Sequence, residues 1–121
     1  MTGWSTRVKS IAALALLAIG VAPAAHAAGR CLTVVDSVNF YHSATFPYDL
    51  PADQDPLFAS LDDTPQARDF EAYVRRTYGV SGKIETSCRI ALDNEMEMEG
   101  DHTMGTVTFH HVQTRYVPQA R

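Results

Sequence analysis

The residues best suited to chemistry in this sequence are sulfur- and nitrogen-bearing side chains gathered in one short segment. Met96, Met98, His102 and Met104 fall within nine residues. Thioether and imidazole groups suit Cu(I), and an exported protein can meet copper. In a helix, Met98 and His102 would be four residues apart and would share a face. The segment therefore predicts, as an alternative function, a periplasmic copper-binding protein that uses Met98, His102 and Met104.

Two other interpretations of the same residues compete with copper. Methionines fill gaps in cores, so these side chains could pack inside while the intervening glutamates face water, and this is the interpretation that we favour. A zinc site would instead combine His102, His110 and His111 with an acidic residue. Adjacent residues of a strand point to opposite faces, so only one of His110 and His111 could join such a site.

A nucleophilic centre is not indicated. A catalytic serine needs a base and an orienting acid close to it. Ser43 follows His42 directly, and in an extended segment the two side chains point to opposite faces. The sequence also lacks the Gly-x-Ser-x-Gly pattern of hydrolases. We therefore predict no catalytic residue, with an enzyme of unknown class as a minor alternative.

Three aromatic residues lie beside a proline-rich segment and offer a second kind of site. Tyr41, Phe46 and Tyr48 could form a surface that binds a glycan or a peptide. They could equally pack against the face of a sheet. The sequence leaves both interpretations open.

The N-terminus has the pattern of a secretory signal. A short basic start precedes an apolar run at 11–21, and an Ala-His-Ala tripeptide then ends at Ala27, as signal peptidases require. The apolar run is shorter than the roughly 20 residues of a membrane-spanning helix. We predict a cleaved signal at 1–27 and a single exported α+β domain at 28–121, which is periplasmic or secreted.

The predicted domain contains two cysteines, Cys31 and Cys88. Outside the reducing cytosol such a pair is expected to form a disulfide. A redox or metal role is not favoured because the sequence has no Cys-x-x-Cys spacing. Arg30 stands where a lipid-attachment signal needs a small residue, so we reject a lipid anchor at Cys31.

The charge balance restricts the partners. Fourteen acidic and ten basic residues give a net charge of −4, and the predicted signal contains two of the basic residues. Since an acidic surface repels phosphate backbones, we expect no nucleic-acid partner. No later apolar stretch is long enough to span a membrane. We predict a non-catalytic binding or structural domain without a cofactor, whose partner is a protein or a cell-envelope component, a glycan included.

The elements that must position these residues can be read from periodicity. In chain order we expect strands at 32–36 and 38–45, a surface loop at 47–63, a helix at 64–78, a strand at 83–92, a short helix at 93–104 and a strand at 106–117. Thr64 suits a helix N-cap, Pro65 the first helical position and Gly79 a left-handed end. The order β-β-α-β-α-β predicts an α+β fold in which two helices cover one face of a small sheet with one disulfide.

Several short motifs together resemble a group of short exported bacterial domains of uncharacterised function. The motifs are Phe40-Tyr41-His42-Ser43 with Phe46, Phe70-x-x-Tyr73 with Tyr78-Gly79, Cys88, and Val112-x-Thr114-x-Tyr116. The resemblance covers most of the predicted domain and implies export and a β-α-β core, but it transfers no catalytic residue. The chain departs from the group at Arg115, where glycine is usual. It also has Glu-Met alternation where the group has an alanine-rich second helix.

Overall fold

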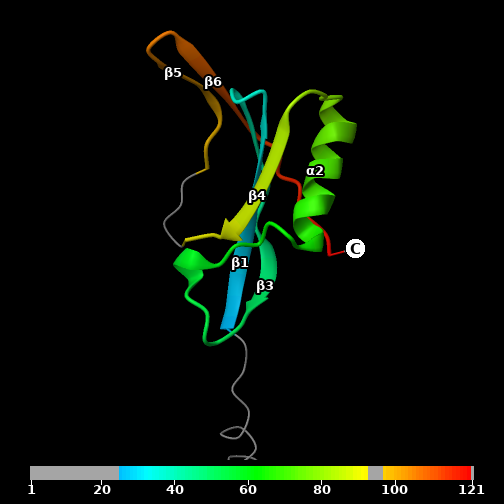
Figure 1. Cartoon of the computed structure of the whole chain (residues 1–121), viewed down its shortest axis with the longest axis vertical. Coiled ribbons are helices and arrows are strands. Elements are labelled where there is room, and N and C mark those ends of the chain that lie inside the picture. The colour runs from blue at the N-terminus through cyan, green and yellow to red at the C-terminus, as the bar shows by residue number, and fades with distance from the viewer. Residues whose placement is uncertain (1–24, 93–96, 121) are drawn as a thin grey trace, which may run out of the picture.

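In the part of the chain that the structure describes, one mixed six-stranded sheet with an α-helix on one face makes up the fold (Figure 1). The structure is a computed structural model, and it describes residues 25–92 and 97–120. In chain order the elements are β1 (Ala25–Val35), β2 (Asn39–His42), β3 (Phe46–Leu50), the 3-10 turn η1 (Pro56–Phe58), α2 (Pro65–Tyr78), β4 (Ile84–Ile90), β5 (Gly100–Met104) and β6 (Val107–Gln113).

The predicted fold class, with two helices over a small sheet, is wrong. In the described part of the chain α2 is the one α-helix, and the sheet has six strands. The helix predicted at 93–104 is replaced at its C-terminal end by β5, which pairs along its whole length with β6. Helix propensity therefore gives way there to hydrogen bonding with a neighbouring strand. Residues 93–96 lie outside the described residues.

The surface loop predicted at 47–63 also needs correction, because it contains most of β3 and the whole of η1. Pro47 and Pro51 suggested a loop. Pro47 nevertheless lies within β3 opposite Ala28 of β1, and β3 is an edge strand with β1 as its one neighbour in the described sheet. Proline is tolerated on an edge strand, where its missing N–H breaks no ladder.

The centre of the sheet is β1, which pairs with strands on both of its edges. β4 pairs antiparallel with it along one edge, and β2 and β3 follow one another along the other. β6 extends the sheet parallel to β2, and β5 completes it. The predicted strand at 83–92 is confirmed as β4. β1 starts at Ala25, while most of the predicted signal lies outside the described residues, so its cleavage stays a prediction.

A β-bulge at 43–45 separates β2 from β3. Leu32 pairs with His42, and Gly29 pairs with Phe46. Two residues of β1 therefore face three residues of the partner strand. One extra residue reverses the alternation of side chains between the two faces of a strand.

Ser43 supplies the hydrogen bonds that hold the bulge. Its fully buried hydroxyl accepts the N–H of Cys31 at 2.8 Å and donates to the carbonyl of Ala44 at 2.7 Å. As a consequence of the reversal, Phe40 before the bulge lies on the face away from α2. Phe46 after it is buried in the core on the helix side.

The predicted helix is confirmed as α2, with the expected ends. The Thr64 hydroxyl accepts the N–H of Ala67, and Gly79 ends the helix with a left-handed φ of 62°. Its buried side chains Ala67, Phe70 and Val74 join the core cluster. In Figure 1, α2 lies along one side of the sheet, while the β5–β6 hairpin lies on the other side of the molecule. The described residues include no helix with the length and apolarity needed to cross a bilayer.

The predicted disulfide is present. Cys31 and Cys88 are bonded and lie directly opposite one another on β1 and β4. Both are buried in the cluster that contains Phe70 and Val74 of α2. The bond therefore ties the central strand to β4 directly beneath the helix.

The strand predicted at 106–117 ends earlier, at Gln113 of β6. Arg115 has a φ of 61°, a conformation that favours glycine. Beyond it the chain leaves the sheet and packs on α2. There the Tyr116 ring stacks on Tyr73 with centroids 3.9 Å apart, and its hydroxyl donates to Asp69.

Replacing both cysteines, as Cys31→Ala/Cys88→Ala, should lower the free energy of unfolding by about 4 kcal/mol, because the bond closes a long loop in the unfolded chain. Urea unfolding of the oxidised wild type and the double variant measures the difference. The variant should be insensitive to added thiol, whereas the wild type should lose stability. A wild-type midpoint that does not move on reduction would contradict the prediction.

Gly29→Ala should destabilise the fold by about 1–3 kcal/mol, because an added Cβ would overlap the buried ring of Phe46. Phe46→Leu replaces that ring by a shorter side chain and so removes the atoms that the added Cβ would overlap. A double-mutant cycle in urea should therefore show that Gly29→Ala costs less in the Phe46→Leu background. Additive effects of the two substitutions would show that the close approach does not matter.

Candidate binding site on the open face of the sheet

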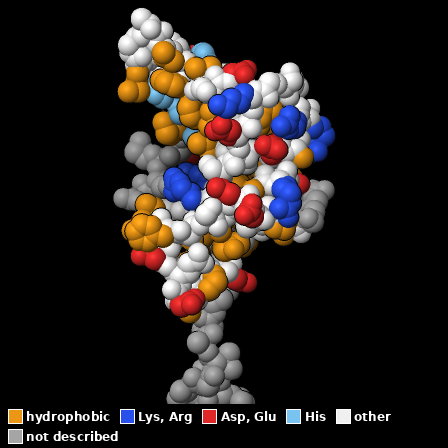
Figure 2. All heavy atoms as spheres, in the orientation of Figure 1, with side chains coloured by type: hydrophobic (Ala, Val, Ile, Leu, Met, Phe, Trp, Pro, Cys, Tyr) orange, Lys and Arg blue, Asp and Glu red, His pale blue; other side chains and the backbone are white. Residues whose placement is uncertain are grey.

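The sheet has two unlike faces. α2 covers one of them, and we call the other the open face. By alternation along the strands, its side chains include Arg30 and Leu32 of β1, Phe40 and His42 of β2, Ser87 and Arg89 of β4, His102 of β5, and Phe109 and His111 of β6. Figure 2 shows histidines among hydrophobic side chains in its upper left part, where the β5–β6 hairpin lies.

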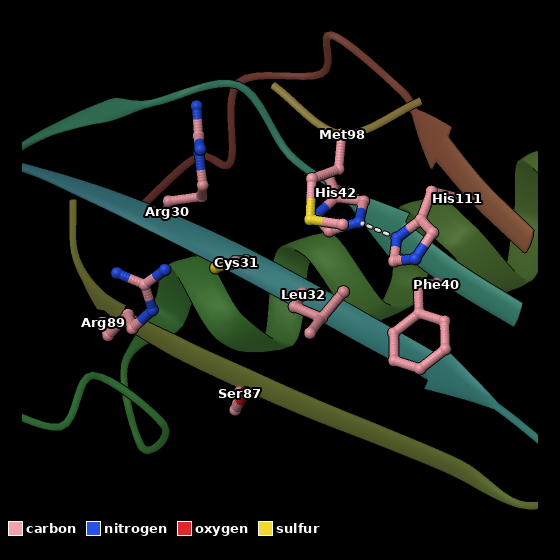
Figure 3. A pocket seen from close by; sticks show the side chains of 9 residues that line it. All are labelled: Arg30, Cys31, Leu32, Phe40, His42, Ser87, Arg89, Met98 and His111. Carbon is pink, nitrogen blue, oxygen red and sulfur yellow. Dashed lines mark hydrogen bonds between the residues drawn. The ribbon is translucent and has the colours of Figure 1, made fainter. Parts of the chain in front are cut away.

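The open face contains a pocket of about 720 Å³. It is lined by Arg30, Cys31, Leu32, Phe40, His42, Ser87, Arg89, Met98 and His111. Figure 3 shows that the two arginines lie at one end and that the histidines, Phe40 and Met98 lie at the other. The lining comes from four strands and from the segment that precedes β5, so the pocket is built by tertiary pairing.

At one end of the pocket three histidines form a hydrogen-bonded row, which we call the histidine array. His42 Nε2 lies 2.9 Å from His111 Nδ1, and His111 Nε2 lies 3.0 Å from His102 Nδ1. A neutral imidazole donates from one nitrogen and accepts at the other. While the three rings are neutral, each hydrogen bond therefore fixes the direction of the next.

Phenylalanines hold the histidine array between them. Phe40 stacks on His111 with ring centroids 4.8 Å apart, and Phe109 stacks on His102 at 5.1 Å. His111 and His102 are also stacked on one another, at 4.8 Å. Rings packed in this way are held in one orientation, as a preorganised site requires.

The environment favours the neutral form of two histidines of the array, His42 and His111. Burial, together with the positive charges that His111 and Arg30 would carry, lowers the pKa of His42 from 6.5 to about 4. Burial and the neighbouring His102 lower the pKa of His111, and Asp101 opposes that shift. Neutral imidazoles carry a lone pair, so His42 and His111 can act as ligands at neutral pH.

The structure places some of the predicted metal ligands at the pocket and the histidine array and others away from them. Met98 lines the pocket, and His102 belongs to the histidine array. Met104 is 66% exposed near the hairpin turn and is not part of the pocket lining. His110 Nδ1 hydrogen-bonds to Asp101 at 2.8 Å, and as the neighbour of His111 on the strand it points away from the open face. Met96 lies outside the described residues. Among residues 25–92 and 97–120, no group of three or more His, Cys, Asp or Glu is placed to hold a metal ion.

The aromatic residues proposed as a binding surface pack against the core. Phe46 is 2% exposed, and Tyr41 and Tyr48 are partly buried against the same cluster. The Tyr41 ring also lies 4.7 Å from that of Tyr78, at the end of α2. The structure gives these three residues a packing role, and ligand binding by them stays a prediction.

Sequence reasoning named His111 beside His102 as a zinc-ligand candidate, and the structure brings these two together, but it missed the contribution of His42 to the same site. A signal was available, because Phe40-Tyr41-His42 and Phe109-His110-His111 are both Phe-x-His segments on expected strands. In each, the phenylalanine and the histidine two residues later share a face. The parallel pairing of β2 with β6, which sets Phe40 opposite His111, brings the two segments together. Ser43, beside His42, is buried in the bulge with its hydroxyl engaged.

The comparisons with known proteins identify no relative: no protein-family model, no curated protein and no solved structure matches this chain. The resemblance to short exported bacterial domains stays a prediction. Any statement of function has to be argued from the pocket and the histidine array.

The lowered pKa of His42 predicts acid sensitivity. In the unfolded chain His42 binds a proton near pH 6.5, but in the folded protein only near pH 4. The free energy of unfolding therefore has its full value above pH 6.5 and falls as the pH is lowered from 6.5 to 4, because over this range the unfolded chain binds a proton at His42 that the folded protein does not. After allowance for solvent screening the loss should be about 2 kcal/mol.

Urea unfolding between pH 7.5 and 4 measures this loss. His42→Phe should flatten the pH dependence, because it removes the group whose pKa is lowered on folding. Equal losses in wild type and His42→Phe would rule out His42 as the source.

Proposed function

We propose that the exported part of the chain is a non-catalytic binding domain that works in the periplasm or outside the cell. The pocket on the open face is its ligand site, and this pocket is the observation that carries the proposal. The secretory pattern at 1–27 supports export. The disulfide supports an oxidising location, because such bonds are rare in the cytosol.

The pocket has the size and composition of a ligand site. Its volume of about 720 Å³ lies within the range of roughly 300–1,000 Å³ that is usual for small-molecule sites. Leu32 and Phe40 supply apolar surface, and Arg30, Arg89 and His42 supply polar groups. Apolar walls with a few convergent polar groups favour a ligand that combines both characters.

The arginines indicate an anionic group on that ligand. Arg30 and Arg89 lie directly opposite one another on β1 and β4, and both line the pocket. Guanidinium groups match carboxylates with paired hydrogen bonds. We therefore propose that the ligand is a carboxylate-bearing component of the cell envelope, with the carboxylate at the arginine end and an apolar part over Leu32 and Phe40.

Filling the pocket tests the proposal. Ser87 lines the pocket and is exposed, so Ser87→Trp should block the ligand without disturbing the core. Purified protein is mixed with isolated envelope, separated into cell-wall and membrane fractions, and the bound fraction is measured by co-sedimentation. We expect wild type to bind and Ser87→Trp to bind at least about tenfold more weakly, which corresponds to about 1.4 kcal/mol.

The matched control is Ala72→Trp, which places the same ring on an exposed residue of α2, away from the open face. This variant should bind like the wild type. The proposal fails if no envelope fraction retains the wild type, or if Ser87→Trp is retained as well as Ala72→Trp.

A further inference from the structure

We propose that His42, His111 and Met98 bind one Cu(I) ion at the histidine end of the pocket, and that His102 holds His111 in the tautomer that this requires. The inference concerns a different ligand, held at the histidine end of the same pocket rather than by the arginines. It also revises the set of ligands predicted from the sequence, because Met104 is left out and His102 becomes a positioning residue.

Two of the donors already face one another. His42 Nε2 and His111 Nδ1 are 2.9 Å apart and share a hydrogen bond. A metal bonded to two imidazole nitrogens at about 2.0 Å each holds those nitrogens roughly 3–4 Å apart, depending on the angle. An ion can therefore replace the shared hydrogen after a small separation of the two rings.

Met98 supplies the third donor. It lines the same pocket as the two histidines, and Figure 3 shows its side chain projecting toward the His42 imidazole. Met98 is 46% exposed, so its flexible side chain can adjust to an ion. A thioether is a soft ligand that favours Cu(I) over the harder divalent ions.

The available chemistry argues against zinc. Structural zinc sites use four ligands drawn from cysteine, histidine and carboxylates. In the described part of the chain no such group of three or more side chains converges, and both cysteines are engaged in the disulfide. Two neutral imidazoles and one thioether instead suit a monovalent ion of low coordination number.

The histidine array determines which nitrogens can bind. If the ion occupies the space between His42 and His111, both His42 Nε2 and His111 Nδ1 must present lone pairs. The proton of His42 then resides on Nδ1, and that of His111 resides on Nε2. The second hydrogen bond, from His111 Nε2 to His102 Nδ1 at 3.0 Å, supports this arrangement. A metal-bound histidine usually donates its other N–H to such a partner.

The surroundings keep the proposed site apolar. Phe40 stacks on His111, and Leu32 lies opposite His42 across the β1–β2 ladder. Both line the pocket. Reduced water access favours the singly charged Cu(I), whose donors here carry no charge, over Cu(II) with its greater need for polar ligands.

Titration with Cu(I) against a competing chelator tests the site. The disulfide-bonded protein is used, under anaerobic conditions with ascorbate as the reductant, so that the disulfide stays intact. We expect one equivalent to bind. Met98→Leu, which keeps the shape but loses the sulfur, should bind at least about tenfold more weakly, and X-ray absorption should show a copper–sulfur contact in wild type but not in Met98→Leu.

Variants of the three histidines distinguish the two that bind the ion from the one that only positions a ligand. His42→Phe and His111→Phe should abolish tight uptake, while His102→Phe should weaken it about 10–100-fold. X-ray absorption of the Cu(I)-loaded His102→Phe protein should still show the copper–sulfur contact. His102→Gln offers an amide oxygen that can accept the His111 N–H, so it should retain most of the affinity.

Met104→Leu and His110→Phe are the matched controls and should bind like the wild type. Failure of the wild type to take up about one equivalent would overturn the proposal. Equal affinity in Met98→Leu and wild type would overturn it as well, and this exposed substitution should not affect folding. Since the probe is the metal alone, neither result depends on envelope binding.

Discussion

The pairing of β1 on both of its edges is the constraint on which the rest of the structure depends. Side chains alternate between the faces of a strand, so a shift of one residue would exchange the core set for the open-face set. The Cys31–Cys88 bond joins directly opposed residues and thereby fixes the register of β4 on β1. That register places Leu32 beside Ser87 and so determines which side chains line the pocket.

On the other edge of β1, the bulge at Ser43 lets one segment of the chain contribute side chains to both faces of the sheet, which uninterrupted alternation would place differently. Before the bulge, Phe40 and His42 contribute to the open face, and after it Phe46 and Leu50 join the hydrophobic core on the other face of the sheet. One continuous segment thus serves both the candidate site and the hydrophobic core. The buried hydroxyl of Ser43 bonds to the backbone of Cys31, so the bulge and the disulfide meet at the same residue of β1.

Local signals predicted the features that local chemistry determines. The capped helix and β4 followed from the types and spacing of nearby residues, and the disulfide followed from the presence of two cysteines in a domain expected to be exported. β5 could not be predicted in this way, because its glutamate- and methionine-rich approach favours a helix and only pairing with β6 makes it a strand. Met98 and His102 were predicted to act together. Their association with His42 and His111 depends on the parallel pairing of β2 with β6, which joins segments about 70 residues apart in the chain. The two Phe-x-His segments are a local sign of a shared site, but they do not show that their strands pair.

The position of β5 at the end of the sheet has a consequence for dynamics. All five of its residues are exposed, and β6 is its one hydrogen-bonded neighbour in the described sheet. Strands with few buried contacts open at a lower free energy than central strands do. His42 is anchored to the rigid centre of the molecule, whereas Met98 and His102 lie on or beside this weakly held hairpin. A ligand that contacts both His42 and the hairpin would therefore join the two parts. Its binding would slow the fluctuations of the β5–β6 hairpin at the outer edge of the molecule.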